Sequence, residues 1–177
     1  AGLTYTPETV YHKLDKEQST RIANAYEAMK DEPNDPEVKA AYAAMAKETT
    51  AQYRAILKTG LVVEFFPNNE DTYGNPRNAI LDVVENNHFY VFSTKAGFGS
   101  NASFDSSKNP NLAETEFKIG DETMLVNDLF RVVHDYFGHI KDGVGFRAEG
   151  EDNAWYSHQA MYSPLARRAM TTETRGQ

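Results

Sequence analysis

Apolar residues recur every three to four positions along two N-terminal stretches, a spacing typical of amphipathic helices. The first predicted helix spans Leu14–Asp31, and the second runs from Pro36 to about Thr59, where Gly60 is suited to end it. Asp35 followed by Pro36 is a favourable N-cap and first-turn pair for the second helix. The two helices are expected to form an antiparallel hairpin with a packing role. The residues expected to face inward from the first helix are Ile22, Ala25, Tyr26 and Met29.

The middle of the chain contains short runs rich in β-branched and aromatic residues, separated by polar stretches, as is typical of short strands. The predicted strands are Leu61–Phe66, His88–Ser93 and Glu114–Ile119. The polar stretch Lys95–Leu112 lies between the last two and is expected to be a long loop. The further predicted helices are Asn75–Asn86, Glu122–Phe137 and Glu151–Arg168. The pattern predicts a mainly helical α+β fold, with an N-terminal helical hairpin, a small sheet of short strands and two C-terminal helices.

Composition narrows the classes of function. With 177 residues, 40% of them hydrophobic and 25% charged, the chain is expected to be one domain over residues 1–177, or a fragment of a longer chain. The net charge of −8 disfavours a surface for nucleic acid or anionic membranes. No apolar run reaches the roughly 18–20 residues of a membrane span, and no signal peptide is recognisable, so a cytoplasmic location is expected. The absence of cysteine excludes disulfides and thiolate metal sites.

Three of the five histidines and several carboxylates fall within Asn127–His158. His134 lies in a predicted apolar helix, where an unpartnered imidazole is costly to bury, so it needs a hydrogen bond or a metal ion. His134 and His139 are five residues apart, about 140° on a regular helix, whereas the zinc-protease pattern HExxH places its histidines about 40° apart. Gly138 can end or distort the helix and bring His139 back toward His134. A shared ion is therefore predicted to depend on Gly138.

The last predicted helix is expected to supply a carboxylate ligand. The residues that share one face of it, at spacings of four, seven and eleven, are Glu151, Trp155, His158 and Tyr162. Glu151 is the preferred metal ligand, and Glu149, just ahead of the helix, is the alternative. His158 is predicted to be a fourth ligand or a proton-transfer group, and Asp135 to orient an imidazole from outside the ligand set.

The segment His134-Asp-Tyr-Phe-Gly-His139 resembles the iron motif of the aromatic amino-acid hydroxylases, whose bacterial members carry the form HDxFGH. In that family, both histidines and a glutamate from a later helix hold non-haem Fe(II). The resemblance implies that His134 and His139 are iron ligands. It covers six of 177 residues, and the family's glutamate lies farther downstream than Glu149 or Glu151. The motif therefore implies a metal more than it implies that family's reaction.

A wider set of segments, NDLFRVVHDYFGH, GEDNAW and TTETRGQ, resembles a group of bacteriophage and marine-bacterial proteins without an established activity. This resemblance implies a viral origin, with the host cytoplasm or the virion as the location. It implies no particular reaction.

Two histidines with a carboxylate form a ligand set for one divalent metal ion and favour Fe(II) over Zn(II), with oxygenase or hydroxylase chemistry. A zinc-dependent hydrolase is the alternative enzyme, although the glutamate that follows the first histidine in zinc peptidases is absent here. Either enzyme would act on a small-molecule or peptide substrate that no segment identifies. The non-enzymatic alternative is a phage structural or interaction protein, in which the cluster is a polar core network and the basic residues Arg167, Arg168 and Arg175 dock an acidic partner.

Overall fold

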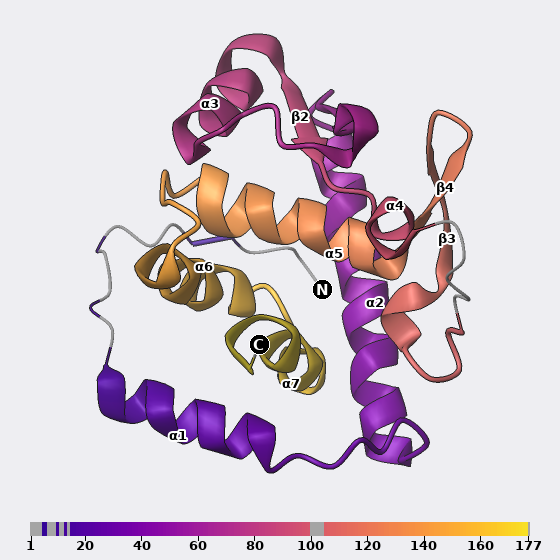
Figure 1. Ribbon diagram of the computed structural model, residues 1–177, viewed down its shortest axis with the longest axis vertical. Coiled ribbons are helices and arrows are strands. Elements are labelled where there is room, and N and C mark those ends of the chain that lie inside the picture. The colour runs from indigo at the N-terminus through magenta and orange to yellow at the C-terminus, as the bar shows by residue number, and fades with distance from the viewer. Residues whose placement is uncertain (1–4, 7–9, 11–12, 14, 100–104, 177) are drawn as a thin grey trace. The chain divides into compact units, whose positions relative to one another are not determined.

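The computed structural model describes residues 5–6, 10, 13, 15–99 and 105–176, and it confirms a mainly helical α+β fold (Figure 1). The chain divides into two compact units. The first unit comprises residues 1–48 and 134–177, and the second comprises residues 49–133. One domain over the whole chain stays a prediction. No described helix is long and apolar enough to cross a membrane.

The described regular elements of the first unit are all helical. They are α1 (Lys16–Glu27), the first part of α2 (Pro36–Leu57), the π-helical turn η4 (Asp135–Ile140), α6 (Ala148–Gln159), α7 (Pro164–Thr171) and η5 (Thr172–Gly176). Helix α6 packs against η4, and η5 contacts α1, α6 and α7. The metal-ligand candidates lie on α5, η4 and α6, so the packing of α6 on η4 positions them.

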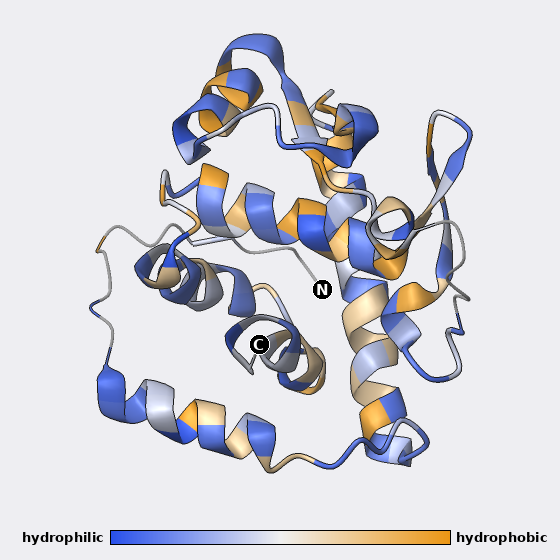
Figure 2. Ribbon diagram, in the orientation of Figure 1, coloured by the Kyte–Doolittle hydropathy of each residue, from blue (hydrophilic) through white to orange (hydrophobic). Residues whose placement is uncertain are grey.

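Both predicted N-terminal helices are present, and an aspartate caps the start of each. The Asp35 cap of α2 was predicted from the sequence. Asp15 accepts the first free N–H groups of α1, and Asp35 does the same for α2. The expected inward packing of the first helix is wrong, because no residue of α1 is buried and Met29, just beyond it, is 56% exposed. Most positions of α1 are hydrophilic (Figure 2), so its apolar stripe is too narrow to drive burial. Helix α1 instead contacts η5, where Arg175 donates to Gln18.

The C-terminal helix predicted over Glu151–Arg168 is two helices. Helix α6 ends at Gln159, and α7 begins at Pro164 with Ser163 as its N-cap. Proline has no N–H for the helical ladder and disfavours a helical conformation at the residue before it, so a continuous helix cannot pass this point. Arg167 closes the intervening turn by donating to the carbonyls of Gln159 and Tyr162.

The second unit contains two short two-stranded sheets. Strand β1 (Val62–Phe65) pairs in parallel with β2 (His88–Val91), and β3 (Glu114–Ile119) pairs antiparallel with β4 (Glu122–Leu125). The helical elements that accompany them are η1 (Pro67–Asn69), α3 (Pro76–Leu81), η2 (Asp82–Asn86), α4 (Thr94–Phe98), η3 (Pro110–Leu112) and α5 (Val126–His134), whose last residue belongs to the first unit. The three predicted strands are therefore present. The predicted loop Lys95–Leu112 begins within α4 and ends with η3, and its residues 100–104 lie outside the described part of the chain.

The predicted helix Glu122–Phe137 is instead a strand, a helix and a π-helical turn. Its first four residues form β4, which returns along β3 after a turn in which Gly120 has a φ of +57°. Asp128 marks the start of α5, because its carboxylate accepts the N–H of Leu125 and is fully buried. The apolar residues of α5 that are completely buried include Leu129, Val132 and Val133. Helix α5 has both hydrophobic and hydrophilic positions along its length (Figure 2).

Candidate metal centre

Three potential ligand atoms converge within the first unit. His134 Nε2, His139 Nε2 and Glu151 Oε2 lie 3.3 Å from one another in all three pairs. Among the described residues, these three side chains form the group that can hold a metal ion. Both imidazoles are buried, whereas the Glu151 side chain is 47% exposed. The structure thus brings two histidines and a carboxylate together, with the carboxylate side accessible to solvent.

The π-helical turn η4 explains how histidines five residues apart share one site. His134 ends α5, and the following backbone bonds from residue i+5 to residue i: Lys141 N–H donates to Tyr136 O, and Val144 N–H donates to His139 O. This wider turn brings residues five apart to the same side, which a regular α-helix does not. Single π turns inside α-helices are frequent at functional sites. The regular-helix geometry that separates the two histidines therefore does not apply.

Of the two predicted effects of Gly138, ending or distorting the helix, the structure shows the second, because Gly138 lies within the π-helical turn and packs closely against α6. The π-helical turn continues through it to Ile140, and its φ is not among the positive values. A Cβ added at Gly138 would lie 2.8 Å from Ala154 Cβ and 3.2 Å from Ala154 O. Only a residue without a side chain lets α6 approach η4 this closely. Gly138 therefore sets the distance between the helix that carries Glu151 and the turn that carries His139.

The remaining ring nitrogens of the two histidines also have partners. His139 Nδ1 lies 3.0 Å from Gly145 O, and His134 Nδ1 lies 3.3 Å from His158 Nδ1. Each ring is thus held from behind while its Nε2 points at the other ligand atoms. Partners of this kind fix the tautomer and orientation of metal-binding histidines.

The three converging atoms need a hydrogen or a metal ion between them. Gly145 O can only accept a hydrogen bond, so His139 Nδ1 carries a hydrogen. A neutral His139 then directs a lone pair at His134 Nε2 and at the carboxylate of Glu151. Converging lone pairs repel, so a hydrogen on His134 Nε2, a second proton on His139 or a metal ion must lie between them. The same three atoms can therefore serve as a hydrogen-bonded cluster or as a metal site.

The electrostatics of the cluster follow from burial and mutual contact. Burial raises the pKa of Glu151, but the hydrogen bonds and charges of His134 and His139 outweigh it, so the pKa lies well below its usual range. Burial lowers the pKa of His139, but the hydrogen bond to Glu151, the charges of Glu151 and Asp135, and the Gly145 carbonyl together outweigh burial and raise it. Full burial and the nearby charges of His134 and His139 lower the pKa of His158. His158 is therefore neutral, and it lies beside the ionised carboxylate cluster.

The triangle of ligand atoms fits a first-row metal ion. Such an ion would be held by His134 Nε2, His139 Nε2 and Glu151 Oε2, and imidazole nitrogen and carboxylate oxygen are both ligands of first-row divalent ions. One face of the ion would then remain open for further ligands.

The other predicted site residues lie around this triangle. His158 is outside the ligand group, behind His134, a position that fits an orienting partner better than a fourth ligand. Glu149 is exposed and also outside the group, which leaves Glu151 as the carboxylate. Asp135 is half-buried at the start of η4, where its charge helps to raise the pKa of His139; its orienting role stays a prediction. Trp155 donates to Thr171 and does not belong to the ligand group.

The structure also shows a contributor that no side-chain pattern indicated, the backbone carbonyl of Gly145. Its position depends on Gly150, because a Cβ at Gly150 would lie 1.7 Å from Gly145 O. The glycines at positions 145 and 150 were visible in the sequence, but their close approach was not. A glycine-rich segment between two histidine-bearing elements was the available signal.

The basic residues expected to dock a partner have contacts within the first unit. Arg175 is largely buried in an ion pair with Asp152, and Arg167 donates to two backbone carbonyls. Arg168 is exposed beside Glu37. A partner at these residues stays a prediction.

Comparison of the chain with protein-family models, curated proteins and solved structures gives no match. The functional argument therefore depends on the geometry of the site.

Proposed function

We propose that this chain is a metalloenzyme whose mononuclear centre consists of one divalent ion bound by His134, His139 and Glu151. The observation that carries the proposal is the triangle of three ligand atoms 3.3 Å apart. Its support is the pairing of each imidazole's other nitrogen, which leaves both Nε2 atoms directed at one point.

We further propose Fe(II) as the physiological metal, with an oxygenase or hydroxylase-like activity. Two histidines and one carboxylate, with one face left open, are the ligand set of non-haem Fe(II) oxygenases, and the HDYFGH motif resembles one such family. Bound Fe(II) would supply redox chemistry with dioxygen at the open positions. The chain's own residues would hold the ion, orient the imidazoles through Gly145 O and His158, and admit substrate on the exposed Glu151 side.

Metal binding tests the proposal, and the chain offers a matched pair of variants. Tag-free protein, stripped with a chelator, is titrated without oxygen with Fe(II) and separately with Zn(II). We expect about one ion per chain, and an affinity loss in E151Q larger than the about 10–100-fold typical of losing an outer-shell partner. E149Q changes an exposed glutamate two residues away and should bind as wild type does. Failure of wild-type protein to bind either metal, or equal loss in E149Q and E151Q, would refute the metal site.

A zinc-dependent hydrolase is the second candidate, because two histidines and one glutamate with an open position are also the ligand set of catalytic zinc sites. The absorption spectrum of the Co(II)-substituted protein distinguishes four-coordinate from six-coordinate ions. The oxygenase is supported if Co(II) is six-coordinate and the Fe(II) form of the wild-type protein consumes more oxygen than E151Q does. The hydrolase is supported, and the oxygenase refuted, if Co(II) is four-coordinate and the protein catalyses metal-dependent hydrolysis without oxygen.

A further inference from the structure

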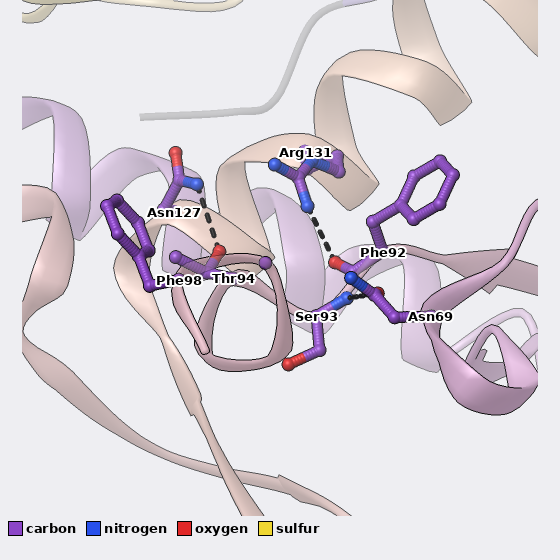
Figure 3. Close-up of a pocket in the computed structure, with 8 residues that line it drawn as sticks. Asn69, Phe92, Ser93, Thr94, Phe98, Asn127 and Arg131 are labelled. Atoms are coloured by element: carbon purple, nitrogen blue, oxygen red, sulfur yellow. Dashed lines mark hydrogen bonds between the residues drawn. The ribbon is translucent and has the colours of Figure 1, made fainter. Parts of the chain in front are cut away.

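A cavity of about 340 Å³ opens within the second unit, among residues that the metal centre does not use (Figure 3). Its walls come from η1, from the junction between β2 and α4, and from α5. This volume lies at the lower end of the about 300–1,000 Å³ typical of small-molecule sites. Any ligand is therefore small.

Hydrogen bonds between the three segments fix the walls of the cavity. Arg131 Nη1 donates to Phe92 O at 2.6 Å, and Asn127 Nδ2 donates to Thr94 Oγ1 at 3.0 Å. The N–H of Ser93 donates to the Oδ1 of the third polar wall residue, Asn69, at 2.8 Å. Each bond joins two different segments, as the dashed lines in Figure 3 show. The cavity is therefore formed before any ligand arrives, which lowers the entropic cost of binding.

Each wall bond uses only part of a side chain's hydrogen-bonding capacity. The Oδ1 of Asn69 accepts one of these bonds, so its Nδ2 remains available as a donor near Gly97. The amide nitrogen of Asn127 donates another, so its oxygen remains available as an acceptor. Arg131 uses one of its five N–H donors, and within the described residues it has no carboxylate partner. The cavity thus offers a guanidinium edge, one amide donor and one amide acceptor.

The charge of the cavity is opposite to that of the chain. Arg131 brings one positive charge into a protein whose net charge is −8, and none of the described residues that line the cavity is a carboxylate. Two acidic residues hydrogen-bond residues that line the cavity. Asp128 accepts the N–H of Thr94 and of Leu125, and Glu122 accepts the hydroxyl of Ser93. An anionic group is therefore the natural partner for the remaining edge of Arg131, because guanidinium and carboxylate form paired, charge-assisted hydrogen bonds.

Two aromatic rings give the cavity apolar walls. Phe92 and Phe98 lie on opposite sides of the group, with Thr94 and Arg131 between them (Figure 3). They are 37% and 62% exposed, which leaves apolar surface uncovered at the rim. A flat apolar body can cover such rings while a carboxylate reaches Arg131.

We propose that this cavity binds a small organic carboxylate with a planar apolar body. The carboxylate pairs with Arg131, the Asn69 amide donates to it, and the body lies at the rim against one of the two exposed phenylalanine rings, Phe92 or Phe98. The site is distinct from the proposed metal centre and does not depend on it.

Benzoate tests the charge and shape of the site, with benzamide as the uncharged control. Titration of labelled protein followed by amide chemical shifts should show benzoate binding, with the shifts centred on residues 92–98 and 127–131. Benzamide should bind at least about tenfold more weakly, because it lacks the charge that strengthens hydrogen bonds to a guanidinium. Metal-free protein should bind benzoate as tightly as metal-loaded protein does. The benzoate result therefore does not depend on whether the proposed metal centre exists.

Two variants separate recognition from folding. N69D keeps the oxygen that accepts the Ser93 N–H but places a negative charge in the cavity, so it should abolish benzoate binding in a folded protein. R131Q should weaken binding at least about tenfold. R54Q is the matched control, because Arg54 is an exposed arginine of the same unit, paired with Glu116 outside the cavity. Absence of benzoate binding, equal binding of benzamide, or full binding by folded N69D would each overturn the proposal.

Discussion

His158 is the residue whose role the structure changes most. It lies behind His134 with the two Nδ1 atoms 3.3 Å apart, is completely buried, and carries a lowered pKa because of that burial. In the proposed metal-bound state, His134 Nε2 would give its lone pair to the ion, so His134 Nδ1 would carry a hydrogen that a neutral His158 can accept. We therefore propose that His158 is a positioning residue that acts through His134.

Replacing His158 should weaken metal binding in a graded way. H158F removes the acceptor while filling the space, so the affinity for Zn(II) should fall about 10–100-fold, as for other lost outer partners. H158N restores an acceptor oxygen and should recover part of the loss. Competition with a chelator of known affinity measures both. If H158F and H158N bind metal as wild type does, His158 does not orient His134.

The close packing of Gly138 against Ala154 leads to a prediction that a double-mutant cycle can test. G138A places a Cβ 2.8 Å from Ala154 Cβ, so the free energy of unfolding should fall by about 1–3 kcal/mol, as in other overpacked sites. A154G removes the opposing methyl group, and the double variant should be less destabilised than the two single losses added together. Urea unfolding measures all four proteins. Additive losses would show that the two residues do not press against each other.

At the scale of elements, a network of side chains ties β2 to the turn before it. Asp82 accepts the Tyr73 hydroxyl at 2.6 Å and the Asn86 amide at 2.9 Å, and it lies 2.6 Å from His88 Nδ1. Burial raises the pKa of Asp82, but the hydrogen bonds from Tyr73, His88 and Asn86 outweigh burial and lower it. His88 is thus a hydrogen-bonded member of this network.

This network predicts the acid side of the stability profile. The folded-state pKa of Asp82 is below its unfolded value of about 3.9, so the stabilisation is fully present above that pH and is lost as pH falls through the folded value. D82N should therefore be less stable than wild type at pH 7, and its free energy of unfolding should change less between pH 5 and pH 3. E85Q alters an exposed carboxylate of the same turn and should keep the wild-type profile. Denaturant unfolding at several pH values provides the comparison.

On the scale of the whole molecule, both candidate sites lie within single compact units. All three ligand residues belong to the first unit, and the Arg131 cavity belongs to the second. Helix α5 carries Asn127 and Arg131 and ends at His134, so one helix supplies residues to both sites. Each site can therefore be tested by variants that leave the residues of the other unchanged.

Metal binding should stabilise the first unit selectively. A ligand at 100 times its dissociation constant adds about 2.7 kcal/mol to the state that binds it. Hydrogen exchange should therefore slow in η4 and at the start of α6 when Zn(II) is added, and a chelator should reverse the effect. The paired strands β1 and β2 hold no ligand and serve as the internal reference. Equal slowing in both units, or none in η4, would contradict a site confined to His134, His139 and Glu151.

Local signals determined many of the elements. Asp35-Pro36 fixed the start of α2, β-branched and aromatic runs fixed β1 and β2, and a mainly helical α+β fold followed from their sum. These features depend on caps, periodicity and side-chain shape within a few residues, which a sequence displays directly. Pro164 was an equally local signal that the prediction of one long C-terminal helix overlooked.

Tertiary contacts decided the rest. Glu122–Leu125 has a helix-compatible pattern, but pairing with β3 makes it a strand. The histidine spacing alone placed two imidazoles on different sides of a helix, whereas the π-helical turn η4 brings them together. Gly138 packs against Ala154, and the carbonyl of Gly145 lies beside His139. Both contacts join different segments of the chain, so no periodic pattern in the sequence predicts them. The sequence by itself determined which residue types were available to bind a metal, and only the tertiary structure decided which of their atoms meet at one point.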